Sequence, residues 1–171
     1  MKQTKFIILR GPSGSGKSTV SKLLFESASN KIALIEQDYY RFVFKPAGGG
    51  SKPNSDAIHE MIKQNVITAL NHGYDVILEG ILSVKSYNEI LDSIFSVHPQ
   101  SNFMYYFDIS FEETIRRHGT RPDKMQEFSA EDMREWYPAS HRSNHTLENI
   151  IPESYTVDDT LKKILTDTQL N

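Results

Sequence analysis

A chain of 171 residues, 38% of them hydrophobic and 24% charged, is long enough to bury a core and has an ordinary globular composition. It contains no cysteine, which excludes a disulfide scaffold, a thiolate nucleophile and cysteine-ligated zinc, so any metal must be held by oxygen or imidazole. The formal net charge of -3 argues against general coating of nucleic acid.

Short apolar runs alternate with longer helical stretches along the chain, which is the pattern of a parallel sheet covered on both faces. Strands are predicted at Lys5–Leu9, Ile32–Glu36, Asp75–Leu78, Phe103–Asp108 and Asn149–Ile151. Helices are predicted at Lys17–Ser27, Ser55–Asn71, Ser86–Ser96, Phe111–His118 and Val157–Leu165. We therefore expect a three-layer αβα fold with about five parallel strands, in a single domain over residues 1–171.

Two segments depart from this alternation. The stretch Lys45–Ser55 contains three consecutive glycines and favours neither helix nor strand, so we predict a surface loop near the substrate. Residues 119–145 are rich in charge, with Trp136 and Tyr137 as large anchors, and are predicted to form a partly helical lid. The early apolar run is too short for a signal sequence or a membrane span, so we expect a cytoplasmic protein with no membrane partner.

A phosphate-binding motif lies directly between the first strand and the first helix. The sequence there fits the pattern G-x-x-x-x-G-K-[ST], and this strand–loop–helix context confirms the motif. Its glycines let backbone N–H groups turn inward around phosphates, and the positive end of the helix attracts anionic oxygen. Lys17 is predicted to reach the terminal phosphates of ATP, and the Ser18 hydroxyl to ligate Mg²⁺. The predicted nucleotide-binding residues are Gly11, Pro12, Ser13, Gly14, Ser15, Gly16, Lys17, Ser18 and Thr19.

An acidic residue follows the second strand, at an edge where ligands gather in open α/β sheets. Asp38 is the candidate general base: its carboxylate would accept the proton of an acceptor hydroxyl that attacks the γ-phosphate. Arg41, three residues later, would hold an anionic or polar part of that acceptor. The alternative is an ordinary helix N-cap aspartate with a solvated arginine. Tyr39 and Tyr40 either line the acceptor pocket or fill the core.

A second acidic residue ends the third strand at the same edge. Glu79 is predicted to orient a magnesium-bound water or to hydrogen-bond the acceptor, and Gly80 to let substrate approach the backbone. The alternative for Glu79 is a solvated strand-end charge. Asp75 lies at the opposite end of this strand and is assigned no chemistry.

Arginines gather where the predicted lid begins. Arg117 and Arg121 are four residues apart, on one helical face, and are predicted to close over the transferred phosphoryl group. The alternative is a helix end that carries cations because of the helix dipole, and Arg116 fits that role. Arg134 and Arg142 cannot be ranked above solvated charges.

The lid also contains histidine and aromatic pairs. His141 and His145 are four residues apart, but no third ligand is evident, so we reject a metal site there. Trp136 and Tyr137 are better explained as packing anchors of the lid than as a base-stacking platform, because stacking platforms usually lie in a basic groove.

Together these residues resemble the small P-loop kinases that phosphorylate hydroxyl groups, a group that includes uridine kinase, chloramphenicol phosphotransferase, zeta toxin and polynucleotide 5′-kinase. The resemblance spans most of the chain, and its anchors are Gly11–Thr19, Asp38 with Arg41, Val76–Gly80, and the arginines near Arg117. It implies a P-loop nucleoside-triphosphate hydrolase fold, with Asp38 as base or acceptor contact and lid arginines on phosphate. It also implies adenine packing near residues 152–156.

The subfamilies differ in the acceptor that they imply. The run Glu79–Leu82 looks like uridine kinase, whereas the spacing of Asp38 and Arg41 looks like polynucleotide 5′-kinase. We predict an ATP- and Mg²⁺-dependent kinase that acts on a hydroxyl of a nucleoside, sugar or antibiotic, as a monomer or homodimer. The alternatives are a kinase of short 5′-hydroxyl nucleic-acid ends and a nucleotide-binding switch without acceptor turnover.

Overall fold

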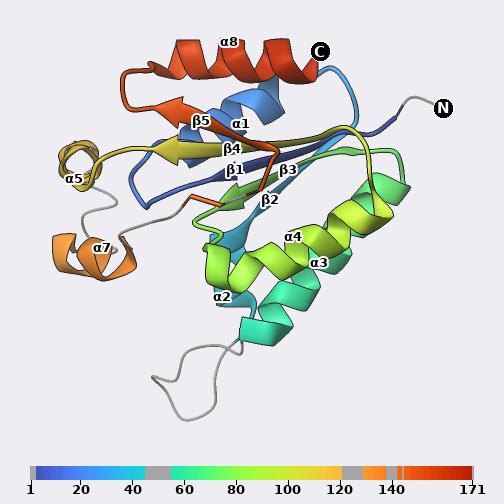
Figure 1. Ribbon diagram of the computed structural model, residues 1–171, viewed down its shortest axis with the longest axis horizontal. Helices are drawn as coiled ribbons and strands as arrows, with labels where there is room; N and C mark the ends of the chain where they lie inside the picture. Colours follow the sequence, from blue (N-terminus) through green and yellow to red (C-terminus); the bar gives the residue numbers. More distant parts are fainter. Residues whose placement is uncertain (1–2, 45–54, 121–128, 138–141, 144, 171) are drawn as a thin grey trace.

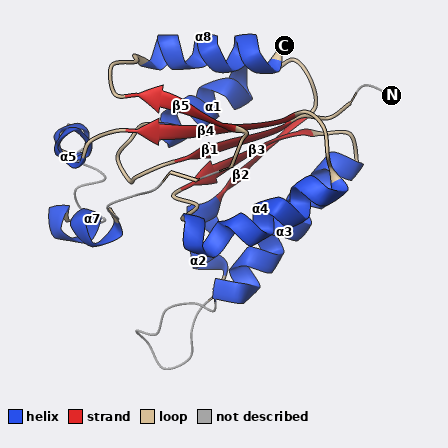
Figure 2. Cartoon of the chain, viewed as in Figure 1, coloured by secondary structure: helices blue, strands red, loops and turns tan. Residues whose placement is uncertain are grey.

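The computed structural model describes residues 3–44, 55–120, 129–137, 142–143 and 145–170. A parallel sheet of five strands runs through the centre of the molecule, in the order β2-β3-β1-β4-β5 (Figure 1). The strands are β1 (Phe6–Arg10), β2 (Ile32–Glu36), β3 (Asp75–Gly80), β4 (Asn102–Asp108) and β5 (Glu148–Pro152). Because all strands are parallel, their carboxyl ends share one edge, away from the two chain termini (Figure 2).

Helices cover both faces of this sheet. They are α1 (Lys17–Ser27), α2 (Gln37–Val43), α3 (Ser55–Asn71), α4 (Val84–Val97), α5 (Phe111–His118), α7 (Ala130–Trp136) and α8 (Val157–Thr168). Helices α1 and α8 cover one face, α3 and α4 cover the other, and α5 and α7 lie beyond the carboxyl edge (Figure 1). The predicted three-layer αβα fold with five parallel strands is confirmed.

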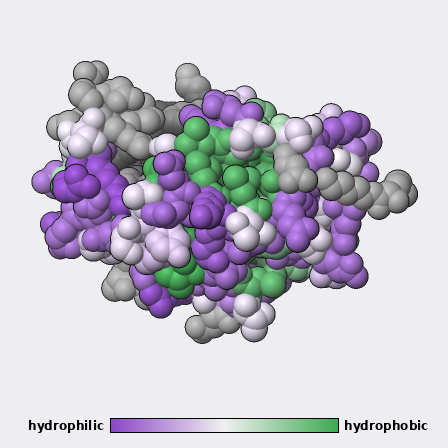
Figure 3. Space-filling view, turned by 90° about the horizontal axis from the view of Figure 1, so that it is seen from above, coloured by the Kyte–Doolittle hydropathy of each residue, from purple (hydrophilic) through white to green (hydrophobic). Residues whose placement is uncertain are grey.

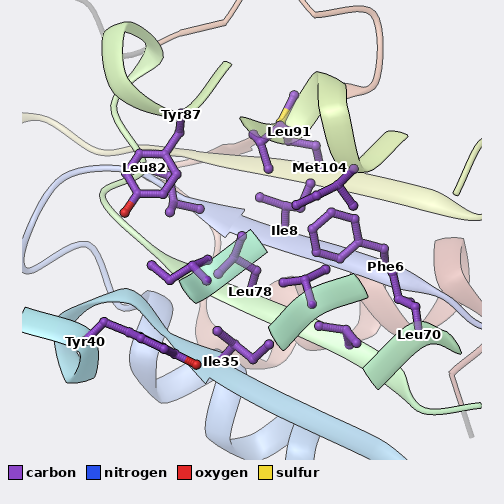
Figure 4. Packing of buried hydrophobic residues seen from close by; sticks show 14 of the residues in the cluster. Phe6, Ile8, Ile35, Tyr40, Leu70, Leu78, Leu82, Tyr87, Leu91 and Met104 are labelled. Atoms are coloured by element: carbon purple, nitrogen blue, oxygen red, sulfur yellow. The ribbon is translucent and has the colours of Figure 1, made fainter. Parts of the chain in front are cut away.

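Alternate residues of the central strand enter different halves of the core. Phe6 and Ile8 of β1 belong to the cluster under α3 and α4, which Figure 4 shows from close by. Ile7 and Leu9 belong to the second cluster, under α1 and α8. Successive side chains of a strand point to opposite faces, so a strand covered on both sides must be apolar throughout. This explains why the apolar runs in the sequence show no alternation with polar residues.

The helices turn apolar stripes toward the sheet. Buried residues recur every four positions along α3, at Ile58, Ile62, Val66 and Leu70, as expected for one helical face. On the face of the molecule in Figure 3, apolar residues gather in a central area bordered by hydrophilic ones. Within the described ranges, no helix is both long and apolar enough to span a membrane.

Each predicted strand and helix is present, with ends shifted by a few residues, but α2 was not predicted as a helix. Its aromatic residues have weak helix propensity, and tertiary packing stabilises it instead. Tyr40 is only 8% exposed, and its hydroxyl oxygen accepts a hydrogen bond from Asn65 Nδ2 at 2.8 Å. Of the predicted loop Lys45–Ser55, all but Ser55 lies outside the described residues.

A helix is also present within the segment 119–145 that was predicted as a partly helical lid. Helix α7 begins after a capping box, in which Ser129 Oγ accepts from Asp132 N and the Asp132 carboxylate accepts from Ser129 N. This S-x-x-D pattern is a local signal for the start of a helix. The remainder of the segment is described at residues 119–120, 129, 137, 142–143 and 145.

Candidate active site

The loop between β1 and α1 has the backbone that its glycines allow. Gly14 and Gly16 have φ angles of 77° and 99°, values that residues with a Cβ rarely adopt. A Cβ on Gly11 would lie 2.9 Å from the Phe107 carbonyl oxygen, and one on Gly14 would lie 2.9 Å from the Thr114 carbonyl oxygen. The loop therefore needs glycine both for its turns and for its close contact with β4 and α5.

Lys17, at the start of α1, points its ammonium group back over this loop. Its Nζ donates to the Pro12 carbonyl oxygen at 2.8 Å and to Ser15 Oγ at 3.3 Å. The side chain is 5% exposed, and burial lowers its pKa, while Glu79 and Asp38 oppose that shift. A desolvated cation held inside a loop of backbone N–H groups is suited to meet an anionic ligand.

Glu79, at the end of β3, lies beside the same loop. Its Oε1 accepts a hydrogen bond from Ser18 Oγ at 3.2 Å and lies 4.0 Å from Lys17 Nζ. The carboxyl is nearly buried, and this burial raises its pKa although Lys17 opposes the shift. Glu79 is therefore no solvated strand-end charge. The neighbouring hydroxyl and carboxylate oxygens of Ser18 and Glu79 are the kind of ligand that Mg²⁺ prefers, so the residues fit that ion.

Asp38 lies in the first turn of α2, at the same edge of the sheet. The register pairs Glu36 with Glu79, which brings the start of α2 next to the end of β3. The charge of Asp38 acts on both neighbours, because it raises the pKa of Lys17 and that of Glu79. The N-cap of α2 is Glu36, so the alternative that Asp38 is an N-cap is wrong.

The other residues of α2 have distinct positions. Tyr40 fills the core, whereas Tyr39 is 68% exposed and packs its ring edge-on against Tyr40. Arg41 lies within α2, but its side chain lies outside what the structure describes. The predicted acceptor contact of Arg41 therefore stays a prediction.

Gly80 has a different role from the predicted one of admitting substrate to the backbone. A Cβ at this position would lie 2.4 Å from Gln37 Oε1 and 2.5 Å from Gln37 Cβ. The side chain of Gln37 thus fills the space that the glycine leaves. Gly80 therefore lets α2 dock closely on the end of β3.

Gln37 is a site residue that was not predicted from the sequence. Its side-chain Oε1 accepts from Leu82 N at 3.2 Å, and its Nε2 donates to the Tyr87 hydroxyl oxygen at 2.9 Å. Leu82 is fully buried and has a φ of 44°, which is strained for a leucine. Gln37 therefore ties α2, the β3–α4 connection and α4 together. No motif marks such a glutamine.

Arg117 connects α5 to the phosphate loop. Its Nη1 donates to the Ser15 carbonyl oxygen at 2.9 Å, and its Nε donates to Glu113 Oε1 at 2.7 Å. Arg116 pairs with the same glutamate but is 68% exposed, in keeping with a helix-end cation. Arg121, the predicted partner of Arg117, lies outside the described residues.

The other two lid arginines have local partners. Arg134 lies over the Phe111 ring, with its guanidinium carbon 4.4 Å from the ring centroid. Arg142 forms an ion pair with Asp108, at the end of β4. Both contacts hold segments near the sheet edge in place.

The aromatic pair of the lid is divided between two environments. The Tyr137 hydroxyl donates to the Ile109 carbonyl oxygen at 2.9 Å, and its ring packs edge-on against Phe111, as expected of a packing anchor. Trp136 instead lines a cavity at the carboxyl edge. The interpretation of both residues as packing anchors therefore holds for Tyr137, whereas Trp136 also faces open space.

His145 belongs to the packing around α4. Its ring lies 5.0 Å from that of Phe95, and its Nδ1 accepts a hydrogen bond from Leu147 N. His141 lies outside the described residues. Across the described part of the chain, no group of three or more histidine, aspartate or glutamate side chains is arranged to hold a metal.

Two cavities lie along the carboxyl edge. A narrow one of about 30 Å³ includes Gly16, Arg117, Pro152, Tyr155 and Thr156, and so joins the phosphate loop to the segment 152–156. A wider one of about 260 Å³ lies on the side of α2, α3 and α4. It is lined by Gln37, Ser55, Ile58, His59, Ile81, Ser83, Ser86, Tyr87 and Trp136.

Comparison with known proteins assigns the chain to a family. A family model described as an AAA domain matches residues 6–139. A uridine kinase from Alkaliphilus metalliredigens (strain QYMF) is 56% identical over 43 residues, which are 24% of this chain and 21% of that protein. The match thus spans about a fifth of the length of that curated relative.

Solved structures share the fold at low sequence identity. An APS kinase from Mycobacterium tuberculosis, solved with AMPPNP and APS, has a TM-score of 0.73 at 15% identity, over 97% of this chain and 98% of that one. A gluconokinase from Sinorhizobium meliloti 1021 has a TM-score of 0.65 at 15% identity, over 99% and 94%. A tunicamycin resistance protein from Deinococcus radiodurans has a TM-score of 0.66 at 12% identity, over 98% of each chain.

Proposed function

Because the chain belongs to the AAA domain family and has the fold of small P-loop kinases, we propose that it transfers the γ-phosphoryl group of ATP to a hydroxyl of a small molecule. One observation carries this proposal. Lys17, Asp38 and Glu79 come from three separate segments, yet all lie at the edge that holds the phosphate loop. Glu79 Oε1 is 4.0 Å from Lys17 Nζ, and the β2–β3 register brings the start of α2, which carries Asp38, next to Glu79. A cation, a candidate base and a candidate metal ligand at one edge are the parts that phosphoryl transfer needs.

The nucleotide would lie across the loop from Gly11 to Thr19. Backbone N–H groups and Lys17 would surround its phosphates, and Arg117, already held against the Ser15 carbonyl oxygen, would approach from α5. The adenine ring would lie beside Tyr155 and Thr156 at the mouth of the narrow cavity, because about 30 Å³ is too small to enclose it. Arg121 is proposed to join Arg117 from the lid segment 119–145.

Ser18 and Glu79 would hold Mg²⁺, Glu79 either directly or through a water molecule. Such an ion supplies neutralisation of the charge on the β- and γ-phosphates. Glu79 needs a cation nearby, because burial raises its pKa and so disfavours its charged form. Lys17 supplies part of that compensation at 4.0 Å.

The transfer step assigns one proton to Asp38. Its carboxylate would accept the hydroxyl proton of the acceptor while the hydroxyl oxygen forms a bond to the γ-phosphorus. The bond from that phosphorus to the β–γ bridging oxygen breaks, and ADP leaves. Lys17 and Arg117 would stabilise the charge on the transferred group, and Arg41 would hold the acceptor.

The acceptor class is narrowed by the proteins that this chain is similar to. They include a uridine kinase, a gluconokinase and an APS kinase. Their names share transfer to a small molecule and differ in the acceptor. Nucleosides, sugars and antibiotics are therefore the acceptor pools to compare.

The test is an assay with γ-labelled ATP, Mg²⁺ and separate pools of nucleosides, sugars, aminoglycoside and phenicol antibiotics, and 5′-hydroxyl oligonucleotides. Wild type should transfer label to one pool, and Asp38→Asn should bind ATP as tightly but transfer little. Label in the oligonucleotide pool alone would make the protein a nucleic-acid end kinase. ATP hydrolysis without transfer to any pool would contradict the proposal and favour a nucleotide-binding switch.

A further inference from the structure

We propose that the cavity between α2, α3, α4 and the end of α7 is the acceptor site, and that it takes an uncharged, hydroxylated molecule with a planar ring, such as a nucleoside. The ring would lie against Trp136 and direct its hydroxyl toward Asp38. This inference rests on the proposed kinase function and adds to it the place and the chemical class of the acceptor.

The walls of the cavity suit a flat ring. Ile58 and Ile81 contribute apolar surface from α3 and from the β3–α4 connection, and Trp136, at the end of α7, also lines the cavity. The His59 ring packs edge-on against Tyr87, with centroids 4.6 Å apart. Planar rings bind between such surfaces because aromatic contacts add to the burial of apolar area.

Polar atoms in the cavity can fix the orientation of a ring edge. Gln37 is only 7% exposed, and its two hydrogen bonds to Leu82 N and the Tyr87 hydroxyl leave one amide N–H and one oxygen lone pair. Ser83 is the N-cap of α4, but its side chain makes no capping hydrogen bond. The amide and the hydroxyl can therefore donate to and accept from a ligand.

Among the residues that the structure describes, those that line the cavity are neutral at pH 7. They include His59, whose pKa is lowered by burial, with Asp56 opposing the shift in part. A neutral imidazole presents one donor and one acceptor. An anionic group desolvated among these described side chains would lose hydration without gaining a cation from them, so they favour a ring without phosphate or sulfate.

The cavity wall includes residues that adjoin the proposed catalytic residues along the chain. Gln37 immediately precedes Asp38, the proposed base. Ile81 follows Glu79 by two residues, and Gly80 between them packs on Gln37. Chain neighbours of Asp38 and Glu79 therefore form part of the cavity wall, and a hydroxyl bound in the cavity would lie toward Asp38.

Trp136 is the single tryptophan of the chain, so its fluorescence reports on this cavity alone. We would titrate the wild-type protein with uridine, with uridine 5′-monophosphate, with chloramphenicol, and with gluconate as an acceptor without a ring. Uridine or chloramphenicol should change the emission saturably, and each arm identifies a different source of the ring. The monophosphate and gluconate should bind at least about tenfold more weakly, the order expected for a mismatched polar group.

A pair of variants separates the acceptor site from the nucleotide site. Trp136→Leu should raise the acceptor KM about tenfold, since one stacking contact is lost, and leave the ATP KM unchanged. Tyr155→Leu is the matched control, because it removes an aromatic ring beside the other cavity and should raise only the ATP KM. Trp136→Phe should restore part of the acceptor affinity.

The outcomes distinguish the two proposals. Absence of transfer to every acceptor pool would contradict the kinase function, and the acceptor role of the cavity with it. Transfer with an unchanged acceptor KM in Trp136→Leu, and no emission change in the wild type, would overturn the cavity assignment alone. Tighter binding of the monophosphate or of gluconate would overturn the class of acceptor.

Discussion

The sheet edge has a proposed nucleotide side, around the phosphate loop, and a proposed acceptor side, around the wider cavity, and the two are built in different ways. The phosphate loop is nine consecutive residues whose backbone conformation is set by its own glycines. The cavity proposed for the acceptor combines side chains from α2, α3, the β3–α4 connection, α4 and α7. The conformation of the first site is therefore determined by local sequence, whereas the second forms only when distant segments of the chain pack together.

The greatest loss should come from a change on the nucleotide side. Lys17→Met removes the cation that stabilises the transferred phosphoryl group, so label transfer should fall by about 10³–10⁵-fold. Methionine leaves the buried Glu79 carboxylate without the ammonium group that lies 4.0 Å away, so the free energy of unfolding should fall as well. Label transfer and a thermal unfolding curve would be measured on the same preparation, and unchanged transfer would contradict a role for the loop.

Asp38→Asn tests the residue that is proposed to act between the bound nucleotide and the acceptor. Loss of a general base should lower kcat by about 10²–10⁴-fold. The ATP Kd, measured by calorimetry, should stay close to that of wild type, since asparagine keeps the shape of the side chain. Weaker ATP binding with an unchanged kcat would instead assign Asp38 to the nucleotide site.

Gly80→Ala should disturb the acceptor side without touching the phosphate loop. The new Cβ would meet Gln37 at 2.4 Å, and such overpacking costs about 1–3 kcal/mol. The free energy of unfolding in urea should fall, and the acceptor KM should rise while the ATP KM stays the same.

Gly73→Ala is the matched control for Gly80→Ala. Gly73 has a φ of 80°, and among the described residues no atom beyond its chain neighbours lies within 4 Å of its Cβ position. This substitution should cost about 1 kcal/mol through backbone strain and change neither KM. Equal acceptor KM values in the two variants would show that Gly80 has no part in shaping the cavity.

A more modest effect concerns the ion pair that positions Arg117. Hydrogen bonds from Arg116 and Arg117 lower the pKa of Glu113 from its ordinary value of 4.5 to about 2. The folded state therefore binds this proton less readily than the unfolded state. The stabilisation is present above about pH 4.5 and is lost as the pH falls toward 2.

Glu113→Gln should reveal the pH dependence of the stability that the Glu113 ion pair provides. Thermal unfolding should show wild type slightly more stable than the variant at neutral pH and equal to it once the pH has fallen to the lowered pKa of Glu113, about 2. The ATP KM should rise modestly at neutral pH, because Arg117 loses its anchor on Glu113. A stability difference that grows on acidification would contradict the assigned pair.

Much of the fold and of the nucleotide side could be predicted from the sequence. Strands buried on both faces are continuous apolar runs, as at Ile7–Leu9, and a glycine-rich motif of this spacing between a strand and a helix is specific to phosphate binding. The parallel arrangement then places Asp38 and Glu79 at one edge, since each follows or ends a strand. The burial of Glu79 depends on its neighbours in space, which local sequence does not determine.

The acceptor side was less predictable for physical reasons. Gln37 has no motif, and its importance comes from contacts with Leu82 and Tyr87, which lie 45 and 50 positions away along the chain. Trp136 and Tyr137 are neighbours in the sequence, but successive residues at a helix end point in directions about 100° apart. One ring therefore packs on Phe111 and the other lines the cavity.

In the proposed mechanism, ATP cleavage and acceptor phosphorylation are one event at a shared edge of the sheet. ADP release and phosphate-ester formation should therefore be measured in the same reaction, with and without the acceptor identified by label transfer. We expect one ester for each ADP when the acceptor is present, and little ADP without it. ADP release at the same rate in both cases, with no ester formed, would contradict this mechanism.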